Sequence, residues 1–244
     1  MGWYARHVLP RLIEAGCSQP LLMKLRAQYV PQARGKVLEI GIGTGLNLEY
    51  YDPESVELTG LDPAAELTGH ARSRAQELNL PINMLGVSGE SIPCEDKTFD
   101  ALVCTWTLCS IPKVEGALSE MHRVVKPGGK LYFIEHGQSP DASVARWQKR
   151  IEPLWKHIAG GCHLTRSADE LIADSGFHIT QTESAYLPGP RFASLYDSRH
   201  CHSLARRSHP LNGRRFCISG AYGEHTIASK HCAAAKQPPI SPVR

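Results

Sequence analysis

Several features that mark particular classes of protein are missing from this sequence. No apolar run reaches the roughly 18 residues of a membrane-spanning helix. No basic cluster accompanies the net charge of +3, which argues against a nucleic-acid partner. The eight cysteines lack C-x-x-C or disulfide-like spacing, and no apolar signal region opens the chain. We therefore expect a globular protein of the cytoplasm. Of the possible contacts with a membrane, only peripheral contact is compatible with the sequence.

The sequence does contain a glycine turn at the end of an apolar strand pattern. Gly41, Gly43 and Gly45 alternate with other residues, and Glu39 precedes them. Glycine lacks a Cβ, so its backbone adopts positive φ and lets a ligand lie against the amides, while the helix expected next points its positive end at that ligand. The dinucleotide fingerprint would need its third glycine at position 46, where the chain has Leu46. The turn therefore indicates a nucleotide-type cofactor, and its spacing argues against a dinucleotide.

Apolar runs and turn residues alternate along the chain in the order of an α/β protein. Helices are expected as a pair within residues 2–29, at 64–79, up to 125, at 141–158 and at 168–176. Strands are expected from residue 37 and at 56–62, 82–87, 99–105, 130–135 and 177–186. The nearly continuous apolar run at 99–105 is typical of a strand buried on both faces of a parallel sheet.

Three local patterns predict finer structure. Lys126–Gly129 contains proline and two glycines and predicts a turn. Ser167 followed by Glu170 predicts a capping box at a helix start. Apolar residues at helical spacing within 141–158 predict a stripe that faces the core; they are Trp147, Ile151, Trp155 and Ile158.

Asp62 lies at the end of the second expected strand, about twenty residues past the glycines. In doubly wound folds a carboxylate at this position accepts hydrogen bonds from the two ribose hydroxyls of a nucleotide. An Asp before Pro63 also suits the start of a helix. The two roles are compatible, and we expect Asp62 to bind a ribose.

The E-x-G-x-G-x-G pattern, Asp62 and the run Val-Val-Lys-Pro-Gly-Gly-Lys-Leu at 124–131 resemble motifs of class I methyltransferases, which bind S-adenosylmethionine (SAM). The resemblance implies a doubly wound, mostly parallel, seven-stranded Rossmann-like sheet with N-terminal helices over the cleft. It implies that Glu39 stabilises the sulfonium and ammonium of SAM and that the glycines lie against it. Further implied cofactor residues are Ser88, Gly89, Glu90 and Thr105. Many members have Asp where Ser88 stands, so its contact with the adenine amino group is left open.

Segments 102–111, 134–136 and 151–166 resemble the methyltransferase-like proteins known in animals as alkyl thiol methyltransferases, and their small bacterial relatives. The resemblance covers residues 1 to about 195. It implies methyl transfer from SAM to a small-molecule acceptor, such as a thiol or another soft nucleophile. Animal members are membrane-associated, whereas this chain lacks their hydrophobic N-terminal anchor. The alternatives are a phospholipid N-methyltransferase, a quinone C-methyltransferase and a SAM-binding protein without turnover.

Methyl transfer is an in-line displacement, so the protein needs no nucleophile of its own and mainly aligns donor and acceptor and excludes water. A thiol acceptor must become a thiolate. His136 is our first candidate for the base, and a purely structural histidine is the alternative. Thr105, Cys109 and His163 are candidates for the lining of the acceptor pocket.

Three segments are expected: N-terminal helices at 1–35, the SAM-binding domain at 36–196, and an irregular tail at 197–244. The tail is rich in His, Arg, Ser and Pro and lacks periodicity, whereas relatives stop soon after the last strand. We interpret it as a frame-shifted or otherwise unselected extension. Its cysteines and histidines lack the tight pairs of structural zinc sites, so no metal site is predicted.

Overall fold

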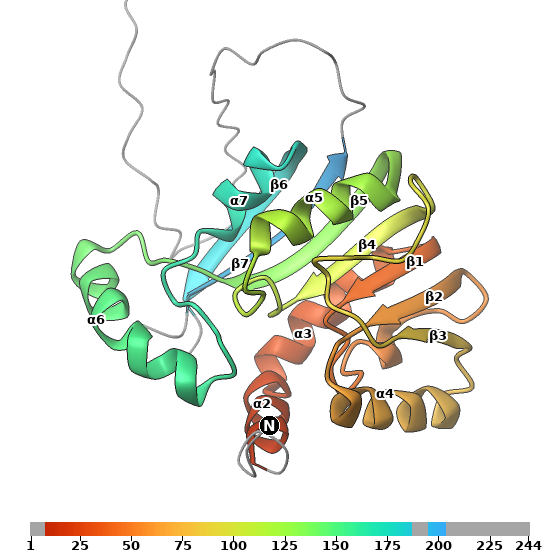
Figure 1. Ribbon diagram of the computed structural model, residues 1–244, viewed down its shortest axis with the longest axis horizontal. Coiled ribbons are helices and arrows are strands. Elements are labelled where there is room, and N and C mark those ends of the chain that lie inside the picture. Colours follow the sequence, from red (N-terminus) through yellow and green to blue (C-terminus); the bar gives the residue numbers. More distant parts are fainter. Residues whose placement is uncertain (1–7, 187–194, 204–244) are drawn as a thin grey trace, which may run out of the picture. The chain divides into compact units, whose positions relative to one another are not determined.

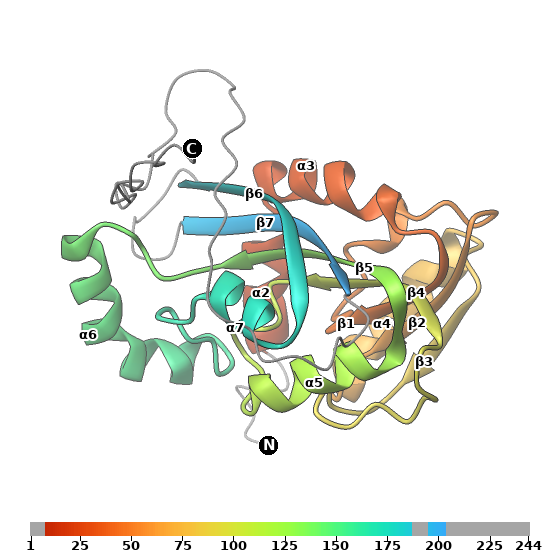
Figure 2. The ribbon, with the colours of Figure 1, turned by 90° about the horizontal axis from the view of Figure 1, so that it is seen from above.

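The computed structural model describes residues 8–186 and 195–203 (Figures 1 and 2). Its strands are β1 (Gly35–Ile40), β2 (Val56–Leu61), β3 (Ile82–Leu85), β4 (Phe99–Thr105), β5 (Val125–His136), β6 (Phe177–Tyr186) and β7 (Leu195–Ser203). Its α-helices are α2 (Leu9–Cys17), α3 (Pro20–Tyr29), α4 (Ala65–Glu77), α5 (Val114–Val124), α6 (Ala142–Ile158) and α7 (Ala168–Asp174). Among these residues no helix combines the length and apolar character required to cross a bilayer.

The seven strands form one sheet in the order β3-β2-β1-β4-β5-β7-β6. All neighbouring strands are parallel except β7, which pairs antiparallel with both β5 and β6. The predicted doubly wound, mostly parallel seven-stranded sheet is confirmed. The strand order reverses between β1 and β4: β2 and β3 follow on one side of this pair, and β5 follows on the other. In open α/β sheets, ligands bind outside the carboxyl ends of the strands at such a reversal.

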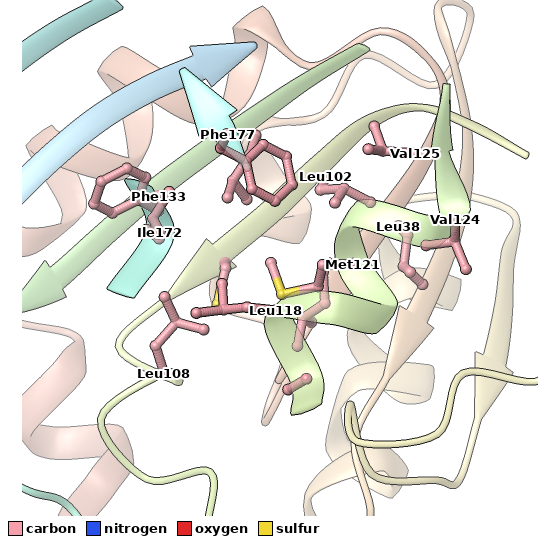
Figure 3. Packing of buried hydrophobic residues seen from close by; sticks show 14 of the residues in the cluster. Leu38, Leu102, Leu108, Leu118, Met121, Val124, Val125, Phe133, Ile172 and Phe177 are labelled. Atoms are coloured by element: carbon pink, nitrogen blue, oxygen red, sulfur yellow. The ribbon is translucent and has the colours of Figure 1, made fainter. Parts of the chain in front are cut away.

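Helices cover both faces of the sheet, because alternate residues of each buried strand point to opposite sides. On one face Leu102 and Phe133 pack with Leu118 and Met121 of α5 and Ile172 of α7 (Figure 3). The other face is covered by α4 and α3: Ala71 and Ala75 of α4 pack with residues of β1 and β4, and α3 packs on β5. The apolar runs of the central strands therefore follow from burial on both faces.

The predicted turn at Lys126–Gly129 lies inside β5 as an irregularity. Phe99 pairs with Val125 and Ala101 pairs with Lys130, so the intervening residues of β5 have no partners in this ladder. Gly128 has φ +78°, which glycine adopts without strain. The proline and glycines therefore bend the beginning of the strand.

Two local predictions were wrong. Ser167 precedes α7, but its side chain caps no backbone amide and instead donates to Asp169. A cap requires the hydroxyl oxygen to accept from a helix amide, whereas here the hydroxyl is turned toward the Asp169 carboxylate, to which it donates. The stripe of α6 does not face the core: Trp147 is 60% exposed and Ile158 48% exposed, and the buried residue of this helix is Gln148.

β7 extends past the predicted boundary at residue 196. Asp197–Ser203 continue the strand and pair with β5 and β6 through their backbone groups. Backbone pairing does not require an apolar sequence, which explains why the pattern analysis did not find a strand here. The rest of the predicted tail, residues 204–244, lies outside the described residues.

Candidate functional site

A cavity of about 680 Å³ lies at the carboxyl ends of the parallel strands. Its walls come from α2, the glycine turn, the ends of β2, β4 and β5, and the loop after α6. Of the predicted cofactor residues, six line it: Gly41, Gly43, Asp62, Ser88, Gly89 and Thr105. Glu39, Gly45 and Glu90 are not in its wall. The volume is typical of a site for a small molecule.

The glycine turn has the backbone geometry that its sequence predicts. Gly41, Gly43 and Gly45 have φ of +70°, +55° and +83°. A Cβ on Gly41 would overlap the side chain of Thr107, and one on Gly45 would lie 2.6 Å from Leu48 Cδ1. A Cβ on Gly43 would meet open space, with Gly41 O at 3.9 Å as its nearest neighbour. The backbone at Gly43 is therefore accessible to a ligand in the cavity.

The α-helix expected directly after the glycines is absent. A single 3-10 turn, η2 (Leu48–Tyr50), follows, and the chain then reaches β2 at Val56. Pro53 follows closely, and the Asp52 side chain accepts a hydrogen bond from Glu54 N, which closes a turn where a helix would have to continue. The cavity therefore receives no α-helix N-terminus at this turn.

Asp62 joins the glycine turn to the start of α4. Its Oδ2 accepts a hydrogen bond of 3.1 Å from Gly43 N, and its Oδ1 accepts one of 2.8 Å from Ala64 N. Burial raises the pKa of Asp62, and these two amides oppose the rise. Each carboxylate oxygen has a second lone pair. Asp62 thus holds both segments in place and keeps acceptor capacity for a ligand.

Glu39 lies beneath the cavity floor and not at its surface. It is 2% exposed, and its carboxylate accepts hydrogen bonds from Asn47 Nδ2 (2.9 Å) and Tyr51 OH (2.8 Å). Glu39 was expected to stabilise a cofactor directly or through water, and its burial leaves no direct contact with the cavity. Its charge acts on the cavity through Asn47, which also donates to Thr105 Oγ1.

Arg26 of α3 completes this buried network and was missed by the sequence analysis. Its Nη1 donates to Asn47 Oδ1 (2.6 Å) and to Thr105 Oγ1 (2.8 Å), and its guanidinium lies 4.6 Å from the Trp106 ring centroid. The residue is 4% exposed and lines the cavity. Its buried Nε has no hydrogen-bond partner among the described residues. The cavity therefore has a fixed cation in its wall.

Glu39 should make stability depend on pH. Burial raises its pKa from 4.5 to about 7, against the hydrogen bonds from Tyr51 and Asn47. The folded state holds the proton more tightly than the unfolded chain, so stability falls as the pH rises from about 4.5 to about 7. In Glu39→Gln this fall, on the order of 3 kcal/mol, should disappear.

The measurement is urea unfolding of both proteins between pH 5 and 8. Gln preserves the shape and can accept from Asn47 while donating to the Tyr51 hydroxyl, so the fold should survive. Glu49→Gln, which changes an exposed acid nearby, is the matched control. Parallel pH profiles for the wild type and Glu39→Gln would contradict the assignment.

The loop at Ser88–Glu90 contributes two of its three residues to the cavity wall. Ser88 Oγ accepts from Glu90 N at 3.3 Å, and a Cβ on Gly89 would lie 3.4 Å from Ile40 Cγ2 and 3.7 Å from Ile111 Cδ1. Glu90 instead uses Oε1 to accept a hydrogen bond from Lys113 N (2.9 Å). Its side chain joins this loop to the start of α5 and does not line the cavity.

Sulfur and imidazole groups line another part of the cavity. Cys162 Sγ lies 3.0 Å from His136 Nε2, and Trp155 Nε1 donates to the same sulfur at 3.2 Å. Cys109 also lines the cavity, whereas His163 is outside its wall and pairs with Glu152 (Nδ1–Oε1 3.4 Å). The cavity thus brings together His136, Cys109 and Thr105 of the predicted acceptor residues, and excludes His163.

Glu135 is a second buried residue whose role was not predicted. It is fully buried, and its Oε1 accepts hydrogen bonds from Thr107 N (2.6 Å) and Leu108 N (2.8 Å). Burial raises its pKa, and the backbone amides oppose the rise. Glu135 therefore fixes the loop after β4, which carries Cys109.

Comparisons with known proteins identify relatives of the chain. A family model for a methyltransferase domain matches residues 38–133. Rat thiol S-methyltransferase TMT1B is 39% identical over 151 residues, 60% of this chain and 62% of the rat protein. Human thiol S-methyltransferase TMT1A is 32% identical over 178 residues, 71% of this chain and 72% of that protein. The chain therefore spans slightly less than two thirds of the length of rat TMT1B.

Among solved structures, a SAM-dependent methyltransferase from Methanosarcina mazei has a TM-score of 0.59. The match covers 77% of this chain and 99% of that one at 23% sequence identity. At this identity the likeness shows a common fold.

Proposed function

The chain belongs to the family of SAM-dependent methyltransferases, and on that premise we propose that it transfers the SAM methyl group to a small thiol. One observation carries the proposal: a single cavity is lined both by the glycine turn with Asp62 and by a cluster of soft side chains, Cys109, His136 and Cys162. The names of the TMT1 relatives also favour a thiol acceptor.

The residues of the cavity fit the charged groups of SAM. Arg26 has a buried Nε without a partner among the described residues, which suits the carboxylate of the methionine moiety. Asp62 has free acceptor capacity for the ribose hydroxyls, and Gly43 lets the cofactor approach the backbone. The buried charge of Glu39 offsets the positive sulfonium and ammonium.

When bound, SAM supplies an electrophilic methyl group. The chain aligns the acceptor with it and keeps water out, for which Trp106 and Trp155 provide large apolar surfaces in the cavity wall. We assign to His136 Nε2 the task of holding or receiving the proton of the acceptor thiol, in concert with Cys162. No residue of the chain needs to become methylated.

An acceptor screen with SAM labelled in the methyl group tests the proposal. We expect label in an alkanethiol and none in the alkanol of the same chain length. Label in phosphatidylethanolamine vesicles or in a quinol instead would favour the phospholipid or quinone alternative. SAM binding in calorimetry without transfer to any thiol, amine or phenol would identify a binding protein without turnover.

The contrast between Gly41 and Gly43 gives a second test of the donor site. Gly41→Ala should destabilise the protein by more than about 2 kcal/mol, because it adds a clash with Thr107 to the cost of positive φ. Gly43→Ala should cost only about 1–2 kcal/mol, since its Cβ meets open space. That methyl would occupy cavity volume, so we expect Gly43→Ala to bind SAM more weakly.

Denaturant unfolding and calorimetry separate the two effects. Equal losses of stability in both variants would contradict the described packing of the turn. Undiminished SAM affinity in Gly43→Ala would place the cofactor elsewhere.

We also propose that the protein works in the cytoplasm. The five cysteines whose side chains are described carry no disulfide, which suits a reducing compartment. Transient contact with a membrane would use α6, which exposes Trp147, Leu154 and Ile158. Fractionation of cells that express the full chain tests this location, and recovery in the secreted fraction would overturn it.

A further inference from the structure

Two thiols and an imidazole converge in the wall of the cavity. Cys109 follows β4, His136 ends β5, and Cys162 lies in the loop after α6. Their ligand atoms all lie within 4.8 Å of one another. Because all three residues line the cavity, the cluster can accept a further ligand from it.

The spacing is close to that of a zinc site with three protein ligands. With Zn–S of about 2.3 Å and Zn–N of about 2.1 Å, a tetrahedral ion separates sulfur from nitrogen by roughly 3.6 Å and the two sulfurs by roughly 3.8 Å. His136 Nε2 and Cys162 Sγ lie 3.0 Å apart, so this distance would have to increase by ~0.6 Å when the ion binds. A rotation of roughly 20° about the Cys162 Cα–Cβ bond supplies this and stays within one staggered well.

The backbone around the cluster is fixed before any ligand binds. His163 N donates to Cys109 O (2.9 Å), which joins the two loops that carry the thiols. Arg166 Nη1 donates to Leu108 O (2.6 Å) and Ile111 O (2.7 Å), and Glu135 holds the same loop from within. The cluster therefore meets the requirement that ligands of a functional site be held in place by their supporting residues.

Two other interpretations use the same atoms. Cys162 and His136 could form an ordinary hydrogen bond, or Cys109 and Cys162 could form a disulfide. A hydrogen bond between Cys162 and His136 does not account for Cys109, and a disulfide does not use His136. Trp155 Nε1, which donates to Cys162 Sγ at 3.2 Å, is an outer donor of the kind that supports a metal-bound thiolate. A soft divalent ion satisfies all three groups together.

We infer that Cys109, His136 and Cys162 bind one Zn²⁺, whose fourth position takes the thiolate of the methyl acceptor; the second part rests on the proposed function. Three protein ligands and one open position are typical of catalytic zinc. The acceptor thiol loses its proton to solvent when it binds the ion, which replaces His136 Nε2 in the task of stabilising the thiolate, because the lone pair of that nitrogen is then bound to the metal. Its sulfur lone pair then forms the new S–CH₃ bond while the sulfonium–methyl bond breaks. The products are a thioether and neutral S-adenosylhomocysteine.

Titration of the metal-free full chain with Co²⁺ tests the site without reference to activity. Wild type should show thiolate-to-cobalt absorption and bind one equivalent more than Cys109→Ser or Cys162→Ser. Cys94→Ser, which changes a cysteine outside the cavity, should behave as wild type. Cysteines and histidines of residues 204–244 remain in every variant, so their contribution cancels in the difference.

The variant Cys162→His is a control for the possibility that the serine variants lose Co²⁺ because they do not fold. It keeps three ligands, so it should still bind Co²⁺ while losing about half of the thiolate absorption. Equal Co²⁺ binding and absorption in the wild type and all cluster variants would overturn the site. A Cys109–Cys162 disulfide in protein purified without reductant, with no bound metal, would also overturn it.

A further measurement separates this inference from the proposed function. If the site is correct, adding an alkanethiol to the Co²⁺ protein should change its absorption, and the matched alkanol should not. Methylation of the thiol at an undiminished rate by metal-free protein would support the proposed function and overturn the role of zinc. Co²⁺ binding without methylation would retain the metal site and reject thiol transfer.

Discussion

Asn in place of Asp62 is expected to lower the affinity for SAM about 10- to 100-fold while the protein stays folded. A hydrogen bond to a charged group contributes about 1.5–3 kcal/mol, which corresponds to this range. Asp62 Oδ2 accepts from Gly43 N and Oδ1 from Ala64 N. Asn keeps one acceptor oxygen, so one of these bonds survives, whereas the charge that attracts the ribose hydroxyls is lost.

Calorimetric titration with SAM measures the effect, and denaturant unfolding checks the fold. Asp52→Asn is a suitable control, because Asp52 is an exposed acid in the loop before β2. Unchanged SAM affinity in Asp62→Asn, together with normal stability, would remove Asp62 from the cofactor site. A loss of affinity that parallels a loss of stability would indicate a role limited to the turn.

Much of the fold follows from local pattern because the central strands are buried on both faces. The run at 99–105 forms β4 with the predicted bounds, and the pattern at 177–186 forms β6. The pair of helices expected within residues 2–29 includes α2 and α3, which are separated between Cys17 and Pro20. In these segments apolar periodicity and turn residues predict the same helices and strands.

Predictions failed where distant residues decide the structure. An apolar stripe in α6 predicts burial, but among the described residues no other element covers Trp147, which is 60% exposed. The alternation of glycines correctly predicts positive φ, because this backbone geometry depends on the turn alone. The same motif also predicts a following α-helix, which is wrong because the connection to β2 is too short to contain one. β7 lies between two strands that supply its backbone partners, so its polar sequence is tolerated.

The site was predictable where motifs and strand ends place residues at the carboxyl edge of the sheet. The spacing of Gly41, Gly43 and Asp62 along the chain is enough to place them together at the ends of β1 and β2. Arg26 has no such signal, because its partners Asn47 and Thr105 are 21 and 79 residues away. Its role depends on how α3 packs on the sheet, which a single sequence does not reveal.

Replacement of Arg26 by Met should destabilise the protein by about 3 kcal/mol at pH 8 and by less at pH 5.5. Removing one member of a buried charged network leaves the other charge uncompensated, which typically costs several kcal/mol. The charge of Arg26 lowers the pKa of Glu39, so without it this carboxylate is still harder to ionise. Near pH 5.5 Glu39 holds its proton in either protein, and the penalty shrinks.

The double variant Arg26→Met, Glu39→Gln distinguishes the structural role of Arg26 from its role in binding. It should regain most of the stability lost at pH 8, because the Glu39 carboxylate, which lost its cation in the single variant, is then absent as well. It should not regain affinity for SAM if Arg26 binds the methionine carboxylate. Arg34→Met, at a side chain that is 66% exposed, is the control. If the double variant recovers both stability and SAM affinity, the role of Arg26 is limited to the network with Asn47 and Thr105. If Arg26→Met alone is as stable as the wild type at pH 8, the coupling between Arg26 and Glu39 is contradicted.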